Sequence, residues 1–173
     1  KTKVTGERLA MNYWKQYGVD VRGIRYPGLI SYKAPAGGGT TDYAVDIFHA
    51  ALENGHYDCF VRADTRLPMM YMEDAIRATI ALMDAPVESI GESRGGYNLS
   101  GCSFTAAEIA DAVAARVPGF TCDFKPDVRQ EYADSWPDSV DDSAAKQDWG
   151  WKAEYDLGAL CDAMISGIQS SSI

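Results

Sequence analysis

At the start of the chain the spacing of apolar residues changes from that of a helix to that of a strand, and this change restricts the fold more than any other feature. Four apolar side chains recur at the helical i, i+3, i+4, i+7 spacing: Ala10, Tyr13, Trp14 and Tyr17. The spacing predicts a helix over residues 2–17, which Gly18 ends. Residues 19–26 then alternate apolar and polar side chains, as a half-buried strand does, before Pro27 and Gly28. A helix that turns this quickly into a strand is a unit of an α/β fold.

Helical and strand-like segments continue to alternate along the chain, with no internal repeat. Helices are predicted over residues 43–54, 75–83, 105–116, 141–149 and 156–168, and strands over residues 57–61, 69–72, 96–99 and 121–124. The buried stripe of the helix that Pro86 closes is expected to consist of Ala75, Ile76, Thr79, Ile80 and Met83. Thr105 and Glu108 form a capping box, and residues 169–173 are expected to fray. The alternation indicates an α/β chain.

Length and charge limit the class of protein. A chain of 173 residues holds one domain or one and a half. The net charge of −9 leaves no basic surplus for a polyphosphate or an anionic membrane, so neither nucleic acid nor membrane is expected as a partner. The apolar stretches are too short to span a bilayer, and no export signal is expected.

The cysteines and histidines do not form a metal-binding pattern. Cys59, Cys102, Cys122 and Cys161 include no C-x-x-C pair, and only His49 and His56 could join them. No metal site and no disulfide are therefore expected. Four reduced thiols, most of them buried, indicate a cytosol-like compartment: the cytoplasm, or the mitochondrial matrix if the source is a eukaryote.

The glycine-rich motif of dinucleotide-binding domains does not occur in this sequence. That motif, G-x-G-x-x-G, follows a first strand and precedes an acidic residue about 20 positions on. The three glycines that begin at Gly37 lack this spacing, and no strand leads directly into them. By spacing alone, residues 29–42 are a flexible loop.

Six segments spread over the chain carry a more specific pattern. They are RYPGLIS (residues 25–31), GGGTTDYAVDIF (37–48), DTRLPMMYMEDAIRA (64–78), YNLSGCSFTAAEIA (97–110), ADSWPDSVDDSAA (133–145) and DWGWKAEYDL (148–157). Together they resemble the extended short-chain dehydrogenase/reductases, in the branch that oxidises L-threonine and is related to the sugar-nucleotide epimerases. The resemblance implies a doubly wound Rossmann-type fold, of which residues 1–173 are the carboxy-terminal part with a small substrate-binding lobe.

The resemblance also implies a catalytic group. In this family a Y-x-x-x-K sequence begins the helix predicted here over residues 2–17, so Lys3 matches the lysine and the tyrosine would lie two residues before Lys1. A phenol with a pKa of about 10 becomes a base near neutral pH only if a positive charge favours its phenolate. A lysine at i+4 lies on the same helical face and supplies that charge, and it can donate to the nicotinamide ribose. Without the resemblance, Lys3 would be a solvated surface lysine.

Further site residues follow from the same resemblance. Tyr26, Pro27, Gly28 and Leu29 end a predicted strand, where open α/β sheets bind ligands, and are expected to contact the nicotinamide of NAD. Gly39, Thr40, Thr41 and Asp42 are expected to bind the ammonium and carboxylate of an amino-acid substrate. Trp136 is expected to line the substrate cavity.

Each assignment has a structural alternative. Tyr26 and its neighbours could be only a strand-ending turn, Asp42 could cap the helix over residues 43–54, and both roles of Asp42 can coexist. Trp136 could be a core side chain. Trp149 and Trp151 are expected to be packing residues, and Met69, Met70 and Met72 to lie in the core or in a cavity wall. His49 and His56 are expected to be surface or helix-packing groups.

The sequence therefore predicts part of an NAD-dependent oxidoreductase that converts L-threonine to 2-amino-3-oxobutanoate. A sugar-nucleotide epimerase or dehydratase of the same superfamily is one alternative, and a non-catalytic assembly module is another. The helix over residues 2–17 carries more apolar surface than one sheet face needs, and in the resembling family it pairs with its symmetry mate, so a homodimer is expected.

Overall fold

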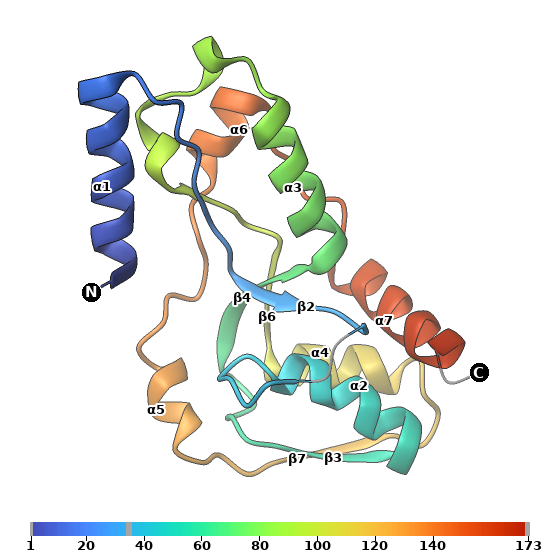
Figure 1. The fold of residues 1–173 in the computed structure, drawn as a ribbon. Helices are drawn as coiled ribbons and strands as arrows, with labels where there is room; N and C mark the ends of the chain where they lie inside the picture. The colour runs from blue at the N-terminus through green and yellow to red at the C-terminus, as the bar shows by residue number, and fades with distance from the viewer. Residues whose placement is uncertain (1, 34–35, 172–173) are drawn as a thin grey trace.

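The computed structural model describes residues 2–33 and 36–171 (Figure 1). Its helices are α1 (Thr2–Tyr17), α2 (Tyr43–Asn54), α3 (Met72–Asp84), α4 (Ala106–Ala114), α5 (Arg129–Ala133), α6 (Ser143–Trp149) and α7 (Leu157–Ser171), with short 3-10 helices η1 (Val87–Ser89) and η2 (Glu92–Gly95). Its strands are β1 (Ile24–Arg25), β2 (Gly28–Ile30), β3 (His56–Cys59), β4 (Arg66–Tyr71), β5 (Tyr97–Asn98), β6 (Cys102–Thr105) and β7 (Thr121–Phe124). The predicted α/β class is confirmed.

Three small sheets organise the described residues. β1 pairs with β5, β2 with β4 and β3 with β7, and all three pairs are parallel. β6 adds to β4 in antiparallel orientation. Tyr26 and Pro27 carry the chain from the first sheet into the second, so these residues connect the two sheets.

Two hydrophobic cores hold these sheets. The larger one joins α2, α4 and α7 and includes Ile30, Phe48, Phe104 and Leu160. The smaller one lies between α3, β5 and the segment around α6, and Trp151 is buried in it. Trp149 packs against this core, so both tryptophans are packing residues as predicted. Met69 and Met70 are fully buried, Cys59 and Cys161 are buried, and all four thiols are free.

The predicted strand over residues 19–26 is wrong in extent. Only Ile24 and Arg25 are extended and paired, and residues 19–23 are irregular. The Arg22 guanidinium instead donates to the carbonyls of Leu82, Met83 and Ala85 at the end of α3. This contact satisfies carbonyls that a helix end leaves free, and it anchors the irregular segment to the end of α3.

The predicted loop over residues 29–42 and the fraying end are also corrected. Residues 28–30 form β2, which pairs with β4. Residues 169–171 belong to α7, where the hydroxyls of Ser170 and Ser171 donate to carbonyls one turn earlier. The remaining two positions of the predicted fraying end, 172 and 173, lie outside the described residues. Besides β2, the strand β6, the helix α5 and the 3-10 helices η1 and η2 were not predicted.

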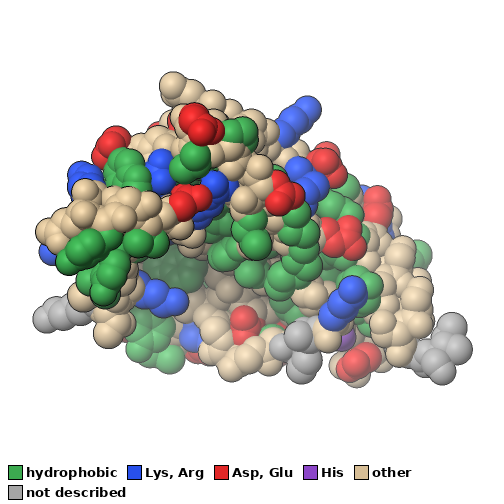
Figure 2. Space-filling model, turned by 45° about the horizontal axis from the view of Figure 1, so that its top comes forward, with side chains coloured by type: hydrophobic (Ala, Val, Ile, Leu, Met, Phe, Trp, Pro, Cys, Tyr) green, Lys and Arg blue, Asp and Glu red, His purple; other side chains and the backbone are tan. Residues whose placement is uncertain are grey.

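The predicted buried stripe of α3 is wrong for its large side chains. Ile76, Ile80 and Met83 are each more than half exposed, whereas Ala75, Ala78 and Leu82 are buried. The helix packs its small-residue face on the core, and the described residues leave its large apolar face uncovered. On the face shown in Figure 2, hydrophobic side chains gather around a hollow in the molecule.

Local capping agrees with the sequence at two other helices. Thr105 and Glu108 form the predicted reciprocal capping box of α4. The Asp156 carboxylate accepts from the Ala159 amide at the start of α7. Among the described residues, no helix has both the length and the apolar character that a bilayer crossing requires.

Candidate functional site

Lys3 lies in the first turn of α1 and is exposed. Its side of the helix lines a groove of about 450 Å³, whose other wall is formed by Gly23, Ile24 and Gly95. Within residues 2–33 and 36–171, no hydrogen bond or ion pair engages the Lys3 ammonium. The lysine is therefore placed beside β1, close to the strand that leads into the Tyr26–Leu29 segment.

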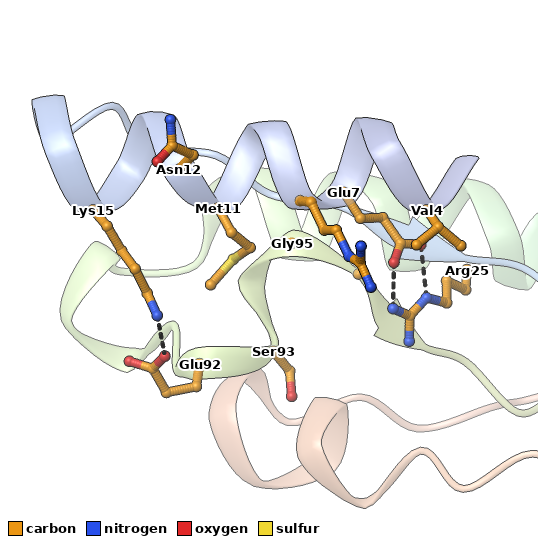
Figure 3. A pocket seen from close by; sticks show the side chains of 11 residues that line it. Val4, Glu7, Met11, Asn12, Lys15, Arg25, Glu92, Ser93 and Gly95 are labelled. Atoms are coloured by element: carbon orange, nitrogen blue, oxygen red, sulfur yellow. Dashed lines mark hydrogen bonds and ion pairs between the residues drawn. The ribbon is translucent and has the colours of Figure 1, made fainter. Parts of the chain in front are cut away.

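A second groove, of about 600 Å³, runs along the same helix (Figure 3). Figure 3 shows Arg25 pointing from β1 toward Glu7 of α1, while Lys15 reaches across to Glu92. Arg25 Nε donates to Glu7 Oε1 at 2.8 Å, and a second contact joins Nη2 to Oε2. The hydrogen bond from Arg25 lowers the pKa of Glu7 below its usual value, although the Glu7 side chain is only partly buried. This charged pair links α1, the helix of Lys3, to the end of β1.

The Tyr26–Leu29 segment is held by its side chains as well as by its backbone. The Tyr26 hydroxyl is 2.5 Å from Oγ1 of Thr79 on α3, so the ring points toward that helix. Gly28 is buried, and a β-carbon there would lie 2.5 Å from Met69 Sδ and 2.8 Å from Thr41 Cγ2. No larger residue fits at position 28 unless its neighbours move.

Gly28 and Thr41 therefore bring two of the predicted site segments together. Residues 30–38 separate the segment Tyr26–Leu29 from the segment Gly39–Asp42 in the sequence, yet the two segments are in direct contact at this point. The roles predicted for these residues stay predictions, but the two segments do form one local surface.

Asp42 organises the glycine loop. Its Oδ2 accepts from the backbone amides of Gly38 and Gly39, each at 2.6 Å. Gly38 has a φ of +94°, which L side chains rarely adopt, so glycine is needed there. Asp42 is the N-cap residue of α2, as the alternative predicted, but its side chain makes no capping hydrogen bond because the carboxylate is turned back to the loop.

Trp136 lies in the loop after α5 and is 43% exposed, so it is not a core side chain. Its amide donates to the Ala133 carbonyl at the end of α5. No hydrogen bond or ring contact joins Trp136 to Lys3 or to Thr41 in the part of the chain that the structure describes.

Three groups that the sequence analysis did not single out hold the Trp136 loop. Buried Gln130 accepts from the Arg62 amide at 2.7 Å and donates to Asp134 at 2.7 Å. The Arg62 guanidinium also donates to both oxygens of Asp134. These contacts depend on tertiary folding, and a five-residue helix such as α5 is too short for a periodic pattern that could have identified them.

Comparison with known proteins gives a consistent result. No family model matches the chain. The chain is 49% identical over 166 residues to the mitochondrial L-threonine 3-dehydrogenase of Bos taurus, covering 95% of this chain and 44% of that protein. It is 46% identical over 168 residues to an uncharacterized epimerase/dehydratase of Staphylococcus aureus, covering 96% of this chain and 52% of that protein.

Solved structures agree with these relatives. The GalE-like L-threonine dehydrogenase of Cupriavidus necator superposes with a TM-score of 0.92 at 56% identity, over 96% of this chain and 60% of that one. The L-threonine dehydrogenase of Clostridium difficile superposes with a TM-score of 0.95 at 43% identity, over 99% of this chain and 54% of that one. The chain thus spans about half the length of the proteins it matches.

Proposed function

The chain is a homologue of the GalE-like L-threonine 3-dehydrogenases over about half of their length, and from this premise we propose that it forms the carboxy-terminal part of such an enzyme. The observation that carries the proposal is the match of 95% or more of the chain to these enzymes. The reaction is oxidation of L-threonine to 2-amino-3-oxobutanoate with reduction of NAD.

Lys3 is the proposed catalytic residue of this part. Removing the hydroxyl proton of a secondary alcohol requires a base, and a tyrosine of the preceding segment would supply it. The Lys3 ammonium is exposed and unpaired among the described residues, so its charge is available to favour a phenolate. The same ammonium can donate to the ribose next to the nicotinamide.

The residues present fit one end of NAD. The donor at Lys3 and the backbone between Tyr26 and Leu29 suit the nicotinamide ribose, whereas the sequence has no G-x-G-x-x-G motif for the pyrophosphate. When bound, NAD accepts the hydride from the substrate carbon. This chain's own residues hold the ring and orient the alcohol toward it.

Thr40, Thr41 and Asp42 are proposed to bind the amino-acid end of the substrate. Asp42 uses Oδ2 for the glycine loop, which leaves Oδ1 to accept from the substrate ammonium. The hydroxyls of the two threonines suit the substrate carboxylate. Trp136, exposed at the end of its anchored loop, is proposed to cover the bound substrate.

An epimerase or dehydratase acting on a sugar nucleotide is the second candidate, because Staphylococcus aureus relatives described in those terms are 46% identical. Glycines at residues 37–39 followed by two threonines and an aspartate favour an amino-acid substrate instead. A non-catalytic assembly module is the third candidate.

One experiment separates the three. A polypeptide that joins these 173 residues to an amino-terminal half with the tyrosine and the glycine-rich motif should form NADH from L-threonine and NAD. The same polypeptide should leave UDP-sugars unchanged, and the 173-residue polypeptide alone should form no NADH. Turnover of a UDP-sugar without threonine oxidation would favour the epimerase, and no turnover of either would favour the assembly module.

A further inference from the structure

The outward face of the β3–β7 pair gathers four polar side chains. The parallel register places His56 opposite Thr121 and Asp58 opposite Asp123. Residues two apart on a strand share a face, so all four side chains lie on one side of the pair. That side is exposed, at the end of the molecule remote from α1 in Figure 1.

Three of these side chains converge on one point. His56 Nε2 lies 3.0 Å from Asp58 Oδ1 and 4.0 Å from Asp123 Oδ2. One ligand atom of each residue lies within 4.8 Å of the other two. Ligand atoms bound to one zinc ion at about 2.0–2.2 Å are separated by at most about 4.4 Å. A small rotation of the side chains therefore brings all three ligand atoms to one ion.

The imidazole is oriented for this role. His56 Nδ1 lies 2.8 Å from the Thr121 hydroxyl oxygen. Without an ion, Nε2 hydrogen-bonds Asp58 Oδ1 at 3.0 Å. In the metal-bound form Nδ1 carries the proton and donates a hydrogen bond to the Thr121 hydroxyl, which leaves the Nε2 lone pair for the ion. Histidines that bind metals are commonly held by a hydrogen bond from the other ring nitrogen.

We propose that His56, Asp58 and Asp123 bind a divalent transition-metal ion of the zinc and cobalt class. One imidazole and two carboxylates are suitable donors for such an ion, and water would complete the coordination because the three side chains are exposed. The ion joins β3 to β7 and stabilises the folded chain, since it binds the native arrangement of two strands distant in sequence.

Lys125 opposes the ion. Its ammonium lies 2.8 Å from Asp58 Oδ2, on the carboxylate whose other oxygen faces His56. A cation bound at Oδ1 is repelled by this neighbouring charge. Removing the Lys125 charge should therefore strengthen metal binding, whereas removing His56 or Asp123 should weaken it.

The test is a calorimetric titration of the untagged 173-residue chain with Co²⁺, followed in parallel by absorption. One saturable site is expected, with the weak visible bands of nitrogen and oxygen ligands. His56→Ala removes a ligand and should weaken Co²⁺ binding about tenfold or more. Lys125→Met removes a repelling charge and should tighten Co²⁺ binding about threefold. His49→Gln, which changes the other histidine, should leave binding unchanged.

Three results would overturn the proposal. They are no saturable binding, equal affinity in the wild type and His56→Ala, or a strong thiolate charge-transfer band that places the cobalt on cysteine. Because His56 and Lys125 are exposed, both variants are expected to fold, and their circular dichroism checks this.

Discussion

Gly28 and Thr41 lie so close together that a β-carbon added to Gly28 would be 2.8 Å from the Thr41 methyl carbon. This approach joins the first residue of β2 to the end of the loop that precedes α2. The two segments proposed to hold the cofactor and the substrate are therefore mechanically coupled, and a change in one should displace the other.

Gly28→Ala should destabilise the chain. The new methyl group would also meet Met69 Sδ at 2.5 Å, and overpacking of this kind costs roughly 1–3 kcal/mol in the free energy of unfolding. Urea unfolding followed by circular dichroism measures the change. Gly37→Ala is the matched control, because a β-carbon there meets nothing within 4 Å, and its stability should stay near that of the wild type. Equal effects at both positions would contradict the packing argument.

Thr41→Val should lower threonine turnover more than tenfold in the complete enzyme, with NAD binding nearly unchanged. Valine keeps the methyl group that packs on Gly28 but removes the hydroxyl, and an unpaired substrate group in a closed site costs roughly 1–3 kcal/mol. Steady-state kinetics and NAD titration measure the two effects. Thr41→Ser keeps the hydroxyl and should retain more activity than Thr41→Val. Unchanged threonine kinetics in the valine variant would move the substrate site elsewhere.

Asp74→Ala should destabilise the chain because the Asp74 carboxylate holds a distant segment. Fully buried Asp74 accepts from the amides of Glu154 and Tyr155 and from the Arg77 guanidinium. Leaving those amides unpaired costs roughly 1–3 kcal/mol. Thermal unfolding should show a lower midpoint for Asp74→Ala than for Asp111→Ala, an exposed position on α4. A midpoint equal to that of the control would exclude this anchoring role.

Contact between α1 and β1 should weaken in acid. Arg25 lowers the folded-state pKa of Glu7 below its usual 4.5, so ionised Glu7 contributes stability above about pH 4.5. That contribution is lost as the pH falls through the lower folded-state pKa. The indole resonance of Trp14, whose ring lies 4.0 Å from the Arg94 guanidinium carbon, should shift over this acidic range. In Glu7→Gln the shift should be absent, and a shift of the same size there would assign it to another group.

Sequence patterns correctly predicted those helices and strands whose ends are set by neighbouring residues, such as a glycine or a cap residue. The bounds of α1, α2 and β7 and the capping box of α4 agree with the sequence, since glycine stops and cap residues act within one turn. The exposed face of α3 could not be predicted in the same way. Apolar spacing identifies a helix, but which of two apolar faces is covered depends on what packs against it.

The candidate site shows the same division. Its segments were identified from their motifs, and the structure adds the contact between Gly28 and Thr41. The Asp42 carboxylate could serve either the helix or the glycine loop, and only the fold decides for the loop. The network of Gln130, Arg62 and Asp134 has no counterpart in local sequence, because its members are up to 72 residues apart.

The last prediction concerns association through α1. Leu9, Tyr13 and Tyr17 are exposed, lie at i, i+4 and i+8, and do not line either groove of this helix. The rings of Tyr13 and Tyr17 are 5.6 Å apart, so the three side chains form a continuous apolar ridge.

Such a ridge is stable in water when it is covered, and a two-fold contact between copies covers both ridges at once. Light scattering on the complete enzyme at micromolar concentration should give the mass of a dimer. Leu9→Glu combined with Tyr13→Glu should shift the mass toward the monomer, because each copy would place two charges in the contact. Tyr132→Glu, which changes an exposed aromatic residue on α5, should remain dimeric. If the wild type is a monomer, or if the variant with both glutamates on α1 is still a dimer, the ridge packs within one chain instead.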